Sequence, residues 1–82
     1  MKRLEINGED LGAIHGKRTV ADTRIWLTTR ADASWWIVIE GPDHKIRTVG
    51  FVRPPQQERA CQTFEDLRKP DVLQALLEGR DS

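Results

Sequence analysis

Cysteine is almost missing from this 82-residue sequence, and tyrosine is missing altogether. Cys61 is the only cysteine, which excludes a disulfide within the chain and a zinc site built from several thiolates. A single thiol is typical of a reducing compartment, so we expect a cytoplasmic protein. The two histidines, His15 and His44, lack the spacing of metal ligands, and we therefore predict no metal and no other cofactor.

The sequence has no excess of charge of either sign, because thirteen Lys and Arg residues balance thirteen Asp and Glu residues. A protein that binds nucleic acid mainly through phosphate contacts is normally strongly basic. The charge balance therefore argues against that class, and it equally excludes an acidic mimic of DNA.

Long apolar runs are also lacking. The longest, Trp35–Ile39, is far too short to cross a bilayer. Lys2 and Arg3 lead into the charged stretch Glu5–Asp10 instead of the apolar core of a signal peptide, so no membrane association is expected. There are no repeats, and residues 1–82 are predicted to form a single domain with a thin core.

Short strands are the main secondary-structure signal. Lys2–Ile6 alternates between apolar and polar residues and is followed by the turn signal Asn7-Gly8. Glu9–Gly16 fits either a return strand or one helical turn. Three further segments are rich in alternating, β-branched or aromatic residues and predict strands: Thr23–Arg30, Ser34–Glu40 and Ile46–Arg53.

The turns between these segments predict how the strands pair. With Ala31–Ala33 as a loop, Arg30 faces Ser34, and the apolar residues of the two strands lie opposite one another. With Gly41–His44 as a four-residue turn, Glu40 faces Lys45. This register predicts a core face of Ile25, Leu27, Trp35, Ile37, Ile39, Ile46 and Val52. Pro54 and Pro55 should end the last strand.

The C-terminal third is predicted to be helical. Thr63 and Asp66 resemble an N-cap pair ahead of a short turn at Phe64–Arg68. Pro70 suits a first helical turn, so the main helix is expected at Pro70–Glu78, with Gly79 as its stop. Gln56–Gln62 fits a loop, a helix or a strand. The predicted fold class is α+β: an antiparallel meander of three to five strands with a C-terminal helix packed on one face.

The second face of the predicted sheet combines aromatic and basic residues. By the same register, this face contains Thr28, Val38 and Val49 in addition to the aromatic and basic residues that are listed below. One interpretation is that the N-terminal segment covers it with Leu4, Ile6, Leu11 and Ile14. The other is an open binding surface, because Trp and Arg dominate the energetics of many interfaces. The predicted binding residues are Arg24, Trp26, Arg30, Trp36, Arg47, Phe51 and Arg53.

Two other patterns suggest chemistry only weakly. Gly12–Thr19 resembles a phosphate-binding loop, but it has three residues between its glycines and Arg18 after Lys17, so we interpret it as a basic loop. A cysteine nucleophile would need Cys61 next to a histidine, and the sequence has no local signature of such a pair. Cys61 is more typical of a small packed hydrophobe.

These observations predict a protein without enzymatic activity that binds a larger protein and occludes or bridges it. Inhibitors, antitoxins, immunity proteins and viral accessory proteins of this size act in that way. One alternative is binding of single-stranded nucleic acid, with bases stacked on the aromatic face. Another is a homodimer that buries the same face. The sequence names neither the partner nor the process.

Overall fold

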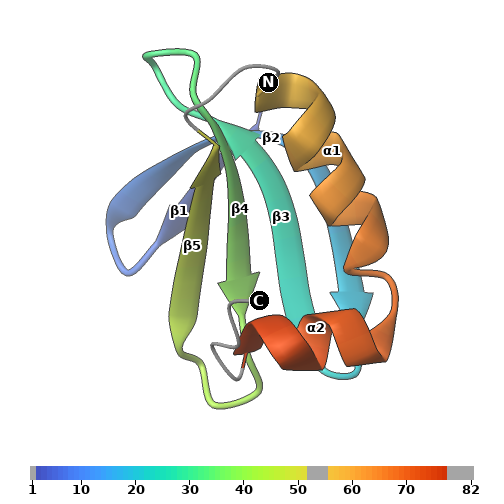
Figure 1. The fold of residues 1–82 in the computed structure, drawn as a ribbon. Coiled ribbons are helices and arrows are strands. Elements are labelled where there is room, and N and C mark those ends of the chain that lie inside the picture. The colour runs from blue at the N-terminus through green and yellow to red at the C-terminus, as the bar shows by residue number, and fades with distance from the viewer. Residues whose placement is uncertain (1, 52–55, 78–82) are drawn as a thin grey trace.

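The computed structural model describes residues 2–51 and 56–77 of the chain. The described strands form one antiparallel sheet in sequence order, and two helices cover one side of it (Figure 1). The elements are β1 (Arg3–Ile6), β2 (Glu9–Val20), β3 (Thr23–Thr29), β4 (Trp35–Glu40), β5 (Ile46–Phe51), α1 (Gln56–Asp66) and α2 (Pro70–Leu77). This arrangement confirms the predicted α+β meander.

Strand β2 is longer than the sequence indicated. Glu9–Gly16 is a return strand, and it continues without a break to Val20. The expected basic loop within Gly12–Thr19 is therefore wrong, because these residues lie inside a strand. β2 pairs first with β1 and then with β3, and its register shifts between Ile14 and Gly16. Gly12 has a φ of 113°, a conformation that side chains rarely adopt.

Two-residue turns connect the first three strands. Asn7 and Gly8 have φ values of 55° and 80°, which confirms the predicted turn. Ala21 and Asp22, with φ values of 48° and 65°, form a second turn of this kind. Positive φ at both central residues is typical of the type I′ hairpin turn, whose twist matches that of the flanking strands.

The main core fills the space between the sheet and the helices that cover it. Its buried members are Ile25, Leu27, Ile37, Ile39, Ala60, Phe64, Leu67 and Leu73. The helix boundaries differ from the prediction. Gln56–Gln62, which the sequence left open, begins α1, and Thr63 lies inside this helix instead of capping one. Helix α2 begins at Pro70, as predicted.

A second core lies on the opposite side of the sheet, where the β1–β2 hairpin folds over β3 and β4. Leu4, Leu11, Trp26 and Val38 are buried there, and the half-buried residues around them are Ile6, Ile14 and Ile46. Both sides of this small sheet are thus covered. The N-terminal segment covers the second face with the four apolar residues that the sequence offered for this role.

The register between β4 and β5 is shifted by one residue from the prediction. Glu40 pairs with Ile46 and Ile37 with Val49, so Val49 faces the helices and Ile46 faces the N-terminal hairpin. A one-residue shift exchanges the two faces of a strand, and every residue of β5 therefore lies on the side opposite to the one expected. The predictions for Val52, Pro54, Pro55, Glu78 and Gly79 lie outside the described residues.

Candidate binding surface

Of the two predicted binding residues in β3, one is buried in the second core and the other is exposed. Trp26 is only 6% exposed and belongs to the second core, with Lys17 Nζ 5.8 Å from its ring centroid. Arg24 is exposed and forms a 3.5 Å ion pair with Glu40 of β4. Exposed pairs of this kind contribute little to stability. Trp26 is therefore a packing residue in this fold, whereas Arg24 remains accessible.

The shifted register of β5 moves two further residues off the predicted face. Phe51 packs against the main core, and Arg47 pairs with Ile39 on the same, helix-covered side of the sheet. The prediction that Arg47 and Phe51 share a face with Trp36 is therefore wrong. Arg53 lies outside the described residues. The aromatic and basic face is consequently smaller than the sequence suggested.

Trp36 and Arg30 remain together on the second face, where both are half-buried and Trp36 lies outside the second core. The Arg30 guanidinium stacks over the Trp36 ring at 3.9 Å, and Trp36 donates its indole N–H to Ser34 Oγ at 2.7 Å. The far edge of the indole lies over Gly50 of β5. Three neighbours thus hold this half-buried ring against the sheet, and the ring is less free to stack on a base than the sequence implied.

Trp35 occupies the corresponding position on the helix side of the sheet. It is half-buried against the main core and pairs with Phe51 across the β4–β5 ladder. The His15 ring lies 5.0 Å from the Trp35 ring, and His15 Nε2 is 2.8 Å from Thr29 Oγ1. The end of the β4–β5 pair is therefore flanked by half-buried aromatic residues on both sides.

Strand β5 is an edge of the sheet, and the hydrogen-bond pattern shows which of its backbone groups have no strand partner in the described part of the chain. Gly41 donates its N–H to the carbonyl of Lys45 at 3.1 Å. Bonded pairs recur at every second residue of an antiparallel ladder. The pairs that follow are Ile39–Arg47, Ile37–Val49 and Trp35–Phe51. The N–H and C=O groups of Ile46, Thr48 and Gly50 therefore point away from β4.

The two edges of the sheet differ in how well they are protected. β1 is four residues long, carries exposed Arg3 and Glu5, and has an irregular register with β2 after Leu4. Short length, charge and irregularity are the usual means of blocking unwanted strand pairing. β5 is six residues long, pairs regularly with β4 and has Arg47 as its one charged residue. Of the two, β5 is the better template for an added strand.

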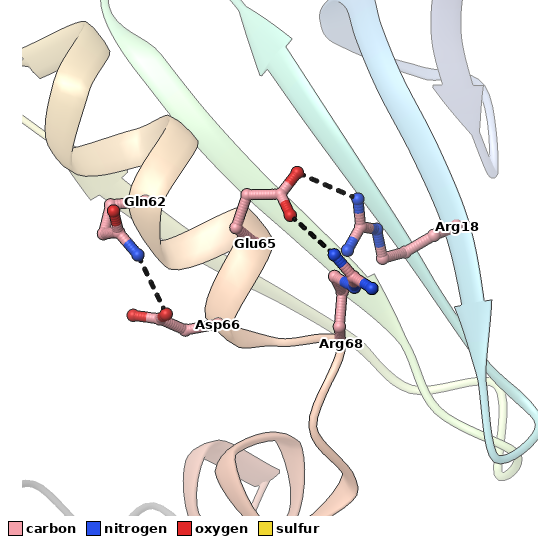
Figure 2. A network of polar contacts seen from close by, with 5 residues as sticks. All are labelled: Arg18, Gln62, Glu65, Asp66 and Arg68. Carbon is pink, nitrogen blue, oxygen red and sulfur yellow. Dashed lines mark hydrogen bonds and ion pairs between the residues drawn. The ribbon is translucent and has the colours of Figure 1, made fainter.

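A polar network joins β2 to α1 and to the turn that follows this helix (Figure 2). Arg18 stacks over Phe64 at 4.3 Å, and its Nη2 lies 3.3 Å from Glu65, which also contacts Arg68 at 3.3 Å. The sequence reasoning missed this role of Arg18, because it placed the residue in a loop. Its alternation with Gly16 and Val20 was the available signal, since all three face the helices.

The candidate nucleophile and the histidines lie in different parts of the fold. Cys61 is on α1 and packs against the main core, as expected of a small hydrophobe. His15 is on β2, and His44 is in the β4–β5 loop with a φ of 63°. Within the described residues, no cluster of His, Cys, Asp or Glu could hold a metal ion.

The described residues of the helical side line shallow hollows, of which two are considered next. One is lined by Glu58, Arg59, Gln62 and Thr63, and the other by Glu65, Arg68, Lys69 and Pro70. Neither of them gathers a nucleophile with a base. None of the helices in residues 2–51 and 56–77 has the length and apolar character needed to cross a membrane. Comparisons with protein-family models, curated proteins and solved structures found no match.

Proposed function

We propose that this chain is a small non-enzymatic module that binds protein through the free edge of β5 and the aromatic residues beside it. One observation carries the proposal: a regular six-residue edge strand has half-buried aromatic side chains on both of its sides. An extended segment that adds to such an edge gains backbone hydrogen bonds, and flanking side chains supply specificity. Trp36 with Arg30 would contact the added strand on one side, and Phe51 on the other.

The structure favours this surface over the larger second face that the sequence suggested. The N-terminal hairpin occupies most of that face, and Trp26 is buried beneath it. Nucleic-acid binding through stacked bases stays a prediction. It has less support than protein binding, because neighbours hold the Trp36 ring and because Arg47 and Phe51 lie on the other side of the sheet. An added protein strand needs no free ring face, because its main contacts are with the backbone.

A substitution at Thr48 tests the edge without disturbing the fold. The Thr48 N–H points away from β4, so Thr48→Pro removes a free donor and leaves the β4–β5 ladder intact. Proline is tolerated at such outward positions of edge strands. Thr48→Ala is the matched control, because it changes the same side chain and keeps the N–H.

The experiment is affinity capture from nuclease-treated and untreated lysate, with the wild type, Thr48→Pro and Thr48→Ala as baits. We expect a stoichiometric protein that survives nuclease, binds the wild type and Thr48→Ala, and is lost with Thr48→Pro. Equal capture by all three baits would remove the edge from the binding site. Capture that requires intact nucleic acid would instead favour the stacking alternative.

A further inference from the structure

We propose that the β5 edge binds a second copy of this chain, with the two β5 strands antiparallel and Val49 opposite its own counterpart. This inference rests on the proposed function, because it names the partner of the same edge. An edge strand that meets itself about a two-fold axis must place residues of the same face opposite one another. That condition limits the pairing to registers centred on a residue.

The side chains of β5 are complementary in the register centred on Val49. On the helix side, Val49 faces Val49 of the second copy, and β-branched residues form favourable cross-strand pairs. Arg47 faces Phe51 of the second copy, where a guanidinium can stack on an aromatic ring. Arg47 and its counterpart are then four positions apart along the ladder, which limits their repulsion.

The opposite side of the paired strands is also compatible. Thr48 faces Gly50 of the second copy, and Gly50 already lies beneath the Trp36 indole. The exposed Thr48 methyl group would then contact that ring. The outward N–H and C=O groups of Thr48 and Gly50 form the bonded pairs of this register, so the groups left free in one chain bond to those of the other.

A neighbouring register is less favourable. Centred on Thr48, it would set Arg47 opposite Val49 and bring the two Arg47 side chains within two positions of one another. Like charges this close on a sheet are destabilising. The charges of the whole chain balance at thirteen and thirteen, so two copies meet no long-range repulsion.

The contact is small, and the dimer should be concentration-dependent. Stable interfaces bury about 1,200–2,000 Å² in total, more than one six-residue strand pair supplies. We expect a dissociation constant between about 1 μM and 1 mM. Sedimentation equilibrium of the purified wild type should show the mass rising toward twice that of the chain across this range. Thr48→Ala should still dimerise, though more weakly, because it keeps the N–H and loses only the methyl contact, whereas folded Thr48→Pro should remain monomeric.

Cysteine cross-linking tests the register. In a Cys61→Ser background, Val49→Cys places two thiols at a directly opposed pair without backbone hydrogen bonds, where Cα atoms are about 4.5 Å apart. This separation suits a disulfide. Thr48→Cys is the control: its side chain is more exposed, but its counterpart lies diagonally, at about 7–8 Å. We expect mild oxidation to link Val49→Cys chains much faster than Thr48→Cys chains.

The outcomes separate the inference from the proposed function. Faster linking at position 48, or a wild type that stays monomeric up to about 1 mM, would overturn the β5–β5 dimer. If such a monomer still captures a different protein from lysate in a manner sensitive to Thr48→Pro, the edge binds that protein and the proposed function stands. A dimer that persists in Thr48→Pro would place the contact elsewhere and overturn the inference.

Discussion

The indole of Trp36 lies directly over the Cα of Gly50. A Cβ atom built on Gly50 would stand 2.7 Å from Trp36 Cη2 and 2.8 Å from Cζ3, closer than carbon atoms approach in proteins. Gly50 is therefore required by its neighbour across the ladder. The consequence is an aromatic ring fixed flat beside the free edge of β5, with Arg30 stacked on it.

Gly50→Ala should lower stability. Replacing glycine in a strand normally gains about 0.5–1 kcal/mol. The clash with the indole should outweigh this gain and cost about 1–3 kcal/mol, because the ring must move and leave Arg30. Urea denaturation and tryptophan fluorescence measure the two effects. In a Trp36→Ala background the same substitution should be neutral or stabilising; an equal cost in both backgrounds would show that the ring is not the obstacle.

Thr28→Val should raise stability. Thr28 is fully buried, and its hydroxyl has no hydrogen-bond partner among the described residues. Valine keeps the shape and removes the unpaired group, a change worth about 1–3 kcal/mol. Thr29→Val is the matched control, since Thr29 Oγ1 is bonded to His15 and its loss should not stabilise. A lower thermal midpoint for Thr28→Val would show that the hydroxyl is satisfied in solution.

Leu73→Ala should destabilise the protein more than Leu76→Ala. Leu73 is 3% exposed within the main core, whereas Leu76 is half-buried at its margin. Truncation of a buried leucine costs about 2–5 kcal/mol, and a partly exposed one costs less. Both changes are on α2 and alter helix propensity equally, so the difference in urea midpoint reports packing. Equal midpoints would place the two side chains in similar environments.

The two hairpins on either side of β4 show why the sequence predicted one register and missed the other. Both loops close in the same way: Ala33 bonds back to Arg30, and His44 bonds back to Gly41. Ala33 and His44 have φ values of 68° and 63°. In each loop the middle residue is an aspartate whose carboxylate accepts the N–H two residues later. The shared aspartate, and the tolerance of histidine for positive φ, were the available signals.

That single misjudged loop accounts for the residues of β5 that left the predicted binding surface. Treating Gly41–His44 as four turn residues moved Glu40 opposite Lys45 and exchanged the faces of β5. Phe51 and Val49 pack against the helices because of the observed register. Their residue types alone would suit either side of the sheet. The cover on the second face was one of two interpretations of the sequence, because it depends on the path of β2, which has a positive φ at Gly12 and a register shift between Ile14 and Gly16. The sequence does not determine that path, because tertiary packing contributes to it.

The stability of the β3–β4 loop should depend on pH. Bonds from the Ser34 hydroxyl and then from the Ser34 N–H lower the pKa of Asp32 below its ordinary value of 3.8. A carboxylate with a lowered pKa stabilises the fold above the pKa of its unfolded form, and this contribution is lost as the pH falls through the folded value. Stability should therefore decrease as the pH falls from about 5 through the lowered pKa of Asp32.

Asp32→Asn isolates this contribution, because the amide oxygen can accept the same bonds without titrating. The wild type should be more stable than Asp32→Asn near about pH 5, and the difference should shrink steadily as the pH falls below that value. Asp10, whose pKa is lowered by the Gly12 N–H and by Arg3, leaves a residual acid dependence in both proteins. Thermal melts across this range measure the difference. If the stability difference between the wild type and Asp32→Asn stayed constant with pH, the charge of Asp32 would make no contribution to folding. The hydrogen bonds of the loop would then stabilise it equally with a neutral acceptor.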